Sequence, residues 1–483
     1  MQEIDIATIR QKAVKGIVAL TGRTFFIQII AFSATFLLTI FLSPAVFGVF
    51  YVVSACISFL SYFSDIGLAA ALIQKKETLT DSDLQTTFTI QQGLVLFLCI
   101  IMFLLSPYIG AFYKLDGSGI WLLRSLIFSF FLSSLKTIPS VLLERKLEFN
   151  KLVIPQIVET IGFYAVSVIL AWRGFGIASF SYAVLVRATL GLVVLYTIAP
   201  WRISIGCSKS VAKKLLRFGI PFQLNSILAL AKDDLMTIFL GRILSFTEIG
   251  YIGWAKKWAE VPLRLIMDSV IRVTFPTFSR LQHDKAFLGK AIEKTLFGLA
   301  VTIIPISMGL LFFIEPVVSL IPKYGKWYPA LFSFYLFVIT SLVASFSTPL
   351  TNALNAVGKI KITLFLMAFW TVATWVLTLT FIPLVGFAGV ALAQSVLSLS
   401  IFIVVALVKK VSPFSFIKSV RIPIAASIMQ GCVYYFFRGT QQYELIRVIS
   451  VALLGVILYI GLVWFFEKKR IQEVLFLFKK DKV

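Results

Sequence analysis

The stretch from 86 to 107 reads TTFTIQQGLVLFLCIIMFLLSP and contains no charged residue. A helix of about 20 mostly apolar residues is long enough to cross the hydrocarbon core of a bilayer. Runs of the same kind, bounded by charges, Gly or Pro, recur along the whole chain. The sequence therefore predicts an all-α polytopic membrane protein of about fourteen transmembrane helices, at 17–42, 45–73, 86–107, 119–143, 152–172, 176–200, 212–240, 248–275, 289–314, 328–356, 361–383, 387–408, 420–437 and 446–466.

The composition leaves little room for a soluble domain. Of 483 residues 59% are hydrophobic and 14% charged, and the mean hydropathy is +0.95. The four cysteines stand singly, without the spacing of a metal site or a disulfide framework. We therefore expect no metal and no cofactor.

The formal charge of +23 would suggest nucleic acid as a partner in a soluble chain. In a membrane protein, basic residues gather in short cytoplasmic loops. With a cytoplasmic N-terminus, the loops on that side carry about 28 Lys and Arg against about 7 on the other. This pattern predicts a multi-pass protein of the cytoplasmic (inner) membrane with both termini in the cytoplasm, and no nucleic-acid partner.

Short repeated segments hint at an internal duplication. Thr39–Leu42 and Thr237–Leu240 share the letters TIFL, and Gly176–Ala178 resembles Gly389–Ala391. Many transporters are built from such repeats, with the substrate path between them. We expect two six-helix halves, at 1–203 and 204–410, followed at 411–483 by two further transmembrane helices and a basic cytoplasmic tail.

Charged residues inside the predicted spans must face water, a partner or a ligand, because each costs roughly 2.5–3.5 kcal/mol in a lipid-facing position. In the eighth span, Lys256, Glu260, Arg264, Asp268 and Arg272 follow one another at four-residue spacing with alternating sign. On one continuous helix they would form a single stripe. Two interpretations stay open: a ladder of mutual ion pairs, or the lining of an aqueous cavity.

Other spans carry charges that admit the same two interpretations, such as an ion pair between Glu159 and Arg187. If these side chains line a cavity, the basic ones suit an anionic substrate and the acidic ones suit ion coupling or charge balance. The candidate substrate-binding residues are Arg23, Lys136, Arg187, Lys256, Arg264 and Arg272. The candidate ion-coupling or charge-balancing residues are Asp233, Asp234, Glu260, Asp268 and Glu159.

Signatures of catalysis are missing from the sequence. The one histidine, His283, lies in a charged loop, and we find neither a glycine-rich phosphate loop nor a nucleophile elbow. We therefore expect no catalytic residues and no enzymatic activity.

Several short segments resemble polysaccharide transporters of the Wzx type, in the multidrug/oligosaccharidyl-lipid/polysaccharide exporter superfamily. The resemblance covers roughly residues 13 to 410, and its segments are Leu42–Gly48, Asp65–Leu68, Ala70–Gln74, Glu144–Phe149, Arg217–Gly219, Ile249–Tyr251 and Phe275–Gln282.

This resemblance implies two six-helix bundles in a V, with two trailing helices. It also implies a function: flipping of an undecaprenyl-diphosphate-linked oligosaccharide across the membrane by alternating access, for O-antigen, capsule or exopolysaccharide synthesis. The implied partners are that lipid-linked oligosaccharide, membrane lipids, a proton or sodium ion, and the polysaccharide polymerase machinery.

Two alternatives compete with this function. A multidrug or other small-molecule exporter of the same superfamily would need an acidic or neutral cavity for organic cations. A membrane-embedded polysaccharide polymerase or glycosyltransferase would need a sizeable loop outside the membrane, which the predicted spans do not leave.

Overall fold

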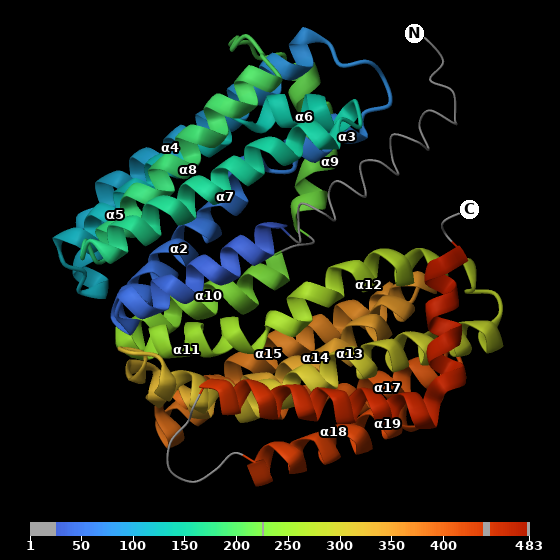
Figure 1. Cartoon of the computed structure of the whole chain (residues 1–483). Coiled ribbons are helices and arrows are strands. Elements are labelled where there is room, and N and C mark those ends of the chain that lie inside the picture. Colours follow the sequence, from blue (N-terminus) through green and yellow to red (C-terminus); the bar gives the residue numbers. More distant parts are fainter. Residues whose placement is uncertain (1–25, 225–226, 438–444, 481–483) are drawn as a thin grey trace. The chain divides into compact units, whose positions relative to one another are not determined.

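The computed structural model describes residues 26–224, 227–437 and 445–480, and the described residues form α-helices and two short 3-10 helices without a strand (Figure 1). The chain divides into two compact units, Met1–Gly250 and Tyr251–Val483. The predicted all-α class is confirmed. The units are described separately below as unit 1 and unit 2.

Unit 1 contains one helical segment at Phe26–Phe41 followed by nine helices and the start of a tenth. Local signals set several of the helix ends. Thr80 accepts a hydrogen bond from Asp83 N while Asp83 Oδ2 accepts from Thr80 N, which is a capping box. The helices are α2 (Pro44–Asp65), α3 (Leu68–Gln74), α4 (Asp81–Tyr113), α5 (Gly117–Ser134), α6 (Thr137–Arg145), α7 (Phe149–Trp172), α8 (Ala178–Ile198), α9 (Lys209–Leu224), α10 (Ile227–Ile243) and α11 (Phe246–Ala259).

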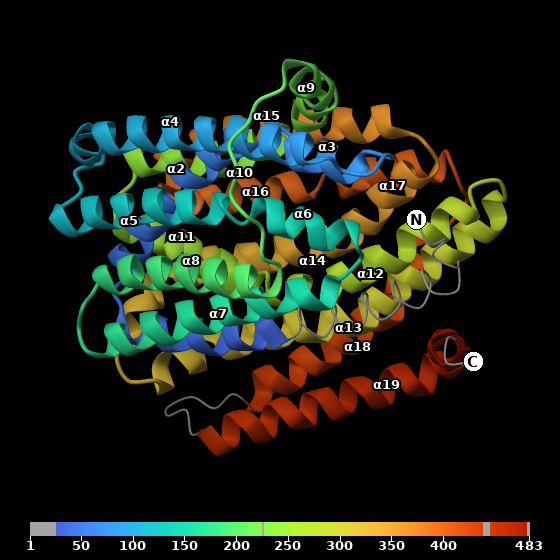
Figure 2. The same cartoon turned by 90° about the horizontal axis from the view of Figure 1, so that it is seen from above.

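The centre of unit 1 is a set of closely packed helices in which α8 contacts both α5 and α7; Figure 2 shows α7 and α8 lying side by side. The ring of Phe180 on α8 stacks on Phe50 of α2 with 4.2 Å between centroids. Phe163 of α7 lies 6.4 Å from the same Phe180 ring. Such aromatic contacts add to the packing that joins the helices.

Two close backbone approaches involve the segments that carry the family resemblance. Gly48 on α2 leaves no room for a Cβ because the carbonyl of Phe246 lies against it, and Gly250 on α11 meets the carbonyl of Pro44 in the same way. The contacts are reciprocal: the first residue of each helix touches the glycine four positions along the other. Both segments read Leu-Ser, three residues, an apolar residue and Gly, at 42–48 and 244–250. This match, missed by sequence reasoning, adds to the predicted duplication.

A third such approach joins the turn between α2 and α3 to α9. Gly67 has a φ of +73°, and a Cβ on it would also collide with the backbone of Gly219. Both requirements favour glycine, since only a residue without a side chain adopts this φ freely and permits the contact.

Unit 2 is built around α14 (Leu331–Ala356), which contacts α12, α13, α16 and α17. Its core includes Leu296, Leu350 and Val404, each fully buried. The remaining elements are α12 (Val261–Arg280), α13 (Lys285–Leu320), η1 (Gly325–Ala330), α15 (Ile360–Val385), η2 (Gly386–Ala388), α16 (Gly389–Ser398), α17 (Ile401–Lys409), α18 (Phe416–Phe437) and α19 (Leu445–Lys480).

The last two helices, α18 and α19, pack on α13. Tyr434 of α18 donates a hydrogen bond to the carbonyl of Ala452 in α19 at 3.3 Å. Tyr459 of α19 donates to the carbonyl of Val301 in α13 at 3.2 Å. In apolar surroundings such bonds satisfy the tyrosine hydroxyls and fix the two helices to the rest of unit 2.

Ten described helical stretches are long and apolar enough to cross a membrane, so the chain is a multi-pass membrane protein. One stretch, Ile360–Lys409, covers two of the predicted spans. The first predicted span lies partly outside the described residues, and the seventh and eighth are each divided into two helices. The count of fourteen therefore stays a prediction, as do the boundaries at 203/204 and 410/411.

Candidate functional site

Three charged side chains meet inside unit 1. Glu159 on α7 accepts a hydrogen bond from Lys136 Nζ at 2.6 Å through Oε1. Its other oxygen, Oε2, lies 3.7 Å from Nε of Arg187 on α8. The first contact is a charge-assisted hydrogen bond, and the second is a longer electrostatic contact. We call these three residues the Glu159 cluster.

Burial within the cluster is graded. The side chains of Glu159 and Lys136 are 11% and 16% exposed, whereas that of Arg187 is 56% exposed. Two cations surround one carboxylate, so the cluster carries a surplus positive charge. Because Glu159 and Lys136 neutralise one another at close range, the surplus resides on Arg187, the exposed member. Its guanidinium also lies 6.0 Å from the centre of the Phe163 ring.

Gly191 on α8 creates the space for the carboxylate. A Cβ at this position would overlap Oε1 and Cδ of Glu159. The absence of a side chain thus lets α8 approach α7 while the carboxylate stays between the helices.

Lys136 owes its place to an interruption between α5 and α6. α5 ends at Ser134 and α6 begins at Thr137, so Leu135 and Lys136 lie between the two helices. Polar side chains gather at this point: Tyr196 donates to the carbonyl of Leu135 at 3.0 Å, and Gln91 donates to Thr137 Oγ1 at 2.8 Å. The prediction included Lys136 but not these neighbours. The adjacent glutamines at 91 and 92, inside an apolar run, were the signal available in the sequence.

Asp234 on α10 forms a second polar contact in unit 1. Ser58 of α2 donates a hydrogen bond to Asp234 Oδ2 at 3.0 Å. The neighbouring Asp233 is exposed. Asp234 is thus hydrogen-bonded to α2, and Asp233 is the more exposed of the two.

The predicted stripe of charges belongs to two helices rather than one. α11 ends at Ala259 and α12 begins at Val261, and Figure 1 shows them meeting at an angle. Pro262, at the second position of α12, cannot donate the backbone hydrogen bond that would continue α11. A single straight stripe was therefore the wrong geometry.

The charges at this bend still interact. Arg264 NH2 lies 2.7 Å from Glu260 Oε2, and its Nε donates to the same oxygen at 3.2 Å. Lys256 is half-buried and Arg272 is exposed. Arg23 lies outside the described residues, and so does the side chain of Asp268. The structure thus brings together Lys136, Glu159 and Arg187 in one unit and Glu260 with Arg264 in the other.

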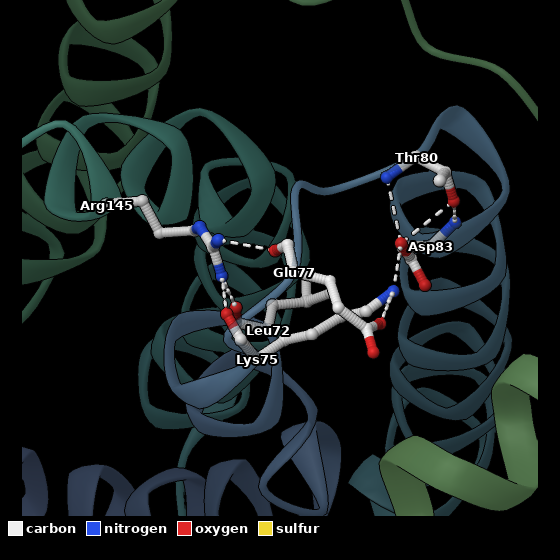
Figure 3. Close-up of polar contacts among 6 residues, drawn as sticks. All are labelled: Leu72, Lys75, Glu77, Thr80, Asp83 and Arg145. Carbon is white, nitrogen blue, oxygen red and sulfur yellow. Dashed lines mark hydrogen bonds and ion pairs between the residues drawn. The ribbon is translucent and has the colours of Figure 1, made fainter. Parts of the chain in front are cut away.

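Arg145 fixes the loop between α3 and α4 at one end of unit 1 (Figure 3). Its NH1 donates to the carbonyls of Leu72 and Lys75, each at 2.6 Å, and its NH2 donates to the carbonyl of Glu77 at 2.8 Å. Lys75 in turn bonds Asp83 Oδ2 at 2.7 Å. Two segments of the family resemblance, 70–74 and 144–149, are thereby held together.

No group of three or more His, Cys, Asp or Glu residues suited to a metal ion occurs in the part of the chain that the structure describes. The arrangement offers cations held beside carboxylates: Lys136 and Arg187 at Glu159 in unit 1, and Arg264 at Glu260 in unit 2. These features suit the binding of an anion more than bond-making chemistry.

The fold is that of a polytopic α-helical membrane protein. A similar solved structure is the lipid II flippase MurJ in an inward closed conformation, with a TM-score of 0.75 and 16% sequence identity over 95% of this chain and 100% of that one. At this identity the likeness shows the fold alone.

The family model for polysaccharide biosynthesis proteins matches residues 37–331, more than half of the chain. The chain therefore belongs to this family, which confirms the resemblance to Wzx-type transporters. Lipopolysaccharide biosynthesis protein WzxC of Escherichia coli (strain K12) is 27% identical over 65% of this chain and 64% of its own length. Succinoglycan biosynthesis transport protein ExoT of Rhizobium meliloti (strain 1021) is 25% identical over 57% and 55%. Both matches span less than two thirds of the relative's length.

Proposed function

We propose that the protein is a flippase that moves a lipid-linked oligosaccharide across the cytoplasmic membrane for the synthesis of a surface polysaccharide such as O-antigen, capsule or exopolysaccharide. Its cargo is a glycan carried on undecaprenyl diphosphate, and it works by alternating access. Membership of the polysaccharide biosynthesis family supports this function. So do the names of its relatives, which include a succinoglycan transport protein, and a fold shared with a lipid II flippase.

The observation that carries the proposal is the graded burial of the Glu159 cluster. A diphosphate is an anion, and Arg guanidinium groups bind phosphate oxygens through several donors at once. Arg187 is more than half exposed, and its guanidinium is held only loosely, 3.7 Å from Glu159 and 6.0 Å from the centre of the Phe163 ring, so it is available to such an anion. Lys136 keeps the carboxylate of Glu159 neutralised while Arg187 engages the cargo.

The other predicted residues enter the proposal in two groups. Arg23, Lys256, Arg264 and Arg272 supply further positive charge to the cargo path. Asp233, Asp234, Glu260, Asp268 and Glu159 balance that charge and couple transport to a proton or sodium ion. We assign no catalytic step to any of them, and we place the protein with transporters rather than with glycosyltransferases or polymerases.

The proposed orientation puts both termini in the cytoplasm of the inner membrane. The proposed organisation has six-helix halves at 1–203 and 204–410 and two additional helices in 411–483. Membrane lipids surround the helices, and the polymerase machinery receives the flipped product.

The test is an export assay with Arg187 as the variable. We expect Arg187→Ala to reduce surface polysaccharide at least tenfold at matched expression, since a hydrogen-bonded charge pair is worth about 1.5–3 kcal/mol. Arg187→Lys should retain part of the export, because it keeps the charge but loses the fork of donors. Lipid-linked precursor should accumulate in cells with the Ala variant.

The matched control is Arg173→Ala, which removes an exposed arginine at the far end of α7 and should leave export unchanged. Arg264→Ala and Arg264→Lys test the second unit in the same way. Full export by both Arg187 variants would remove the Glu159 cluster from the mechanism. Efflux of cationic dyes without polysaccharide export would favour a drug exporter, and formation of sugar bonds by the purified protein would favour a polymerase.

A further inference from the structure

The segment between α8 and α9, at 201–208, is fixed on the surface of unit 1. Gly206 N donates a hydrogen bond to Thr89 Oγ1, and Ser208 N donates to Thr86 Oγ1, each at 3.0 Å. The ring of Trp201 packs against Phe88 with 5.0 Å between centroids. The side chains that this segment exposes are therefore held in defined positions.

α9 continues from this segment as a two-faced helix. Its buried Leu215, together with Val211 and Phe218, packs on a core cluster that includes Leu72 and Ile138. The helix contacts α3 and α4, and Figure 2 shows it at one edge of unit 1. One face of α9 is thus part of the fold, and its other face is directed away from unit 1.

That outer face carries a row of cations. Lys209, Lys213 and Arg217 lie four residues apart and are all exposed. Residues at this spacing lie on one side of a helix, and eight residues span about 12 Å. In the described part of the chain none of the three has an acidic side chain within ion-pair distance.

Beside this row the fixed segment exposes two isoleucines. Ile203 is 55% exposed and Ile205 is 82% exposed. In water these side chains would be unfavourable on a rigid loop, whereas at a membrane surface they would enter the boundary of the acyl chains. Exposed aliphatic groups next to a row of cations are typical of an element that lies on a leaflet.

We propose that residues 203–217 form an interfacial surface that binds the phosphate groups of acidic phospholipids in the leaflet at this end of unit 1. Lys209, Lys213 and Arg217 contact separate headgroups, and Ile203 and Ile205 enter the outer acyl region. Phospholipids fit better than the single diphosphate of a cargo molecule, because the cations are spread along a row and do not converge on one point. Binding holds the exposed face of α9 at the leaflet. The surface does not depend on what the protein transports.

Cys207 provides a reporter inside this surface, since it is exposed in the fixed segment. The full chain with Cys56→Ser, Cys99→Ala and Cys432→Ser would be labelled at Cys207 with a polarity-sensitive fluorophore and placed in nanodiscs. The discs contain phosphatidylcholine with increasing phosphatidylglycerol. We expect the emission to shift to the blue as phosphatidylglycerol increases, and the shift to weaken in high salt.

The combined Lys209→Gln, Lys213→Gln and Arg217→Gln variant should need far more phosphatidylglycerol for the same shift, about fivefold per cation removed. The control with Lys359→Gln, Lys361→Gln and Lys410→Gln removes equal charge from exposed positions of unit 2 and should behave as the parent. The Lys209→Arg and Lys213→Arg variant keeps the charges and should keep the response, which separates lipid binding from misfolding.

Two results would overturn the proposal. One is an unchanged response in the variant lacking the three cations, or an equal loss in the unit 2 control. The other is a shift in pure phosphatidylcholine discs on addition of a polyprenyl diphosphate, with none from phosphatidylglycerol, which would assign the surface to the cargo.

Discussion

The carboxylate of Glu159 contacts two cations, so its replacement should lower the stability of the folded protein. We expect Glu159→Gln to destabilise the protein by about 3 kcal/mol, because it leaves the charge of the mostly buried Lys136 without a partner. Thermal unfolding in detergent, followed by intrinsic fluorescence, measures this loss. The double variant Lys136→Met with Glu159→Gln removes the stranded charge and should recover much of the stability. Equal instability of the single and double variants would contradict this account of the pair.

At Gly191 we expect a Gly→Ala substitution to destabilise the protein, which is the reverse of its usual effect inside a helix. Replacing a glycine inside a helix by alanine normally stabilises it by about 1 kcal/mol. At Gly191 the new Cβ would displace the carboxylate of Glu159, so we expect Gly191→Ala to lower the unfolding temperature and reduce export. Gly93→Ala is the control, since nothing lies within 4 Å of a Cβ there. A Gly191→Ala protein as stable as Gly93→Ala would show that the two helices can separate at no cost.

The sequence anticipated part of this cluster. A pair between Glu159 and Arg187 was one of two open interpretations, and the structure places them in contact while leaving Arg187 exposed. The sequence did not predict that Lys136, rather than Arg187, makes the shorter contact with Glu159. The reason is physical: Lys136 lies where α5 stops and α6 starts, and the apolar run at 119–143 marks that interruption only by Pro139, three residues later. Which cation reaches a carboxylate depends on such local breaks, which hydropathy does not detect.

At the scale of helices and loops, the side chain of Arg145 holds the connection between α3 and α4 in place. The backbone carbonyl of Leu72 in α3 and those of Lys75 and Glu77 in the following loop all accept hydrogen bonds from this one guanidinium. We expect Arg145→Gln to release the loop and to increase tryptic cleavage after Lys75 and Lys76 in the folded protein. Limited proteolysis with mass spectrometry measures the rate. Lys146→Gln, an exposed neighbour, is the control. Equal cleavage of both variants would mean that the loop is held by its other contacts.

Helix interruptions separate what the sequence could predict from what it could not. Windows of about 19 residues find membrane spans but average over a break of one or two residues. The bend at Glu260 was not predicted, because the regular spacing of the charges at 256–272 suggested a continuous helix despite the proline at 262. Spacing alone cannot establish a stripe when a proline falls inside it.

For the molecule as a whole, the distribution of basic residues predicts which side faces the cytoplasm. Cys207 lies at the basic end of unit 1, and Gly117 lies at the opposite end, where α5 begins. In a background without the other three cysteines, an impermeant maleimide applied to intact spheroplasts should leave Cys207 unlabelled. A Gly117→Cys variant, with Cys207 also replaced, should be labelled from outside. The reverse pattern would invert the proposed topology and with it the direction of flipping.

The class of the protein was the most predictable property, because few folds other than a bundle of membrane-spanning helices suit an apolar chain with short basic loops. Composition alone identified an all-α membrane protein, and the ordered short segments identified the family. The close contacts behind those segments were invisible, since a glycine looks the same in sequence whether it faces lipid or another backbone. Gly48 and Gly250 show their purpose only in three dimensions.

Gly48 lies against the carbonyl of Phe246, and Gly250 lies against the carbonyl of Pro44, so both contacts consist of main-chain atoms. Such contacts involve no side-chain rotamers. The first turns of the two helices can therefore rotate against one another without rearranging interlocked side chains. The contacts also place no demand on the chemistry of the surrounding residues. The residues around these two contacts can then be exchanged, provided that positions 48 and 250 keep no side chain.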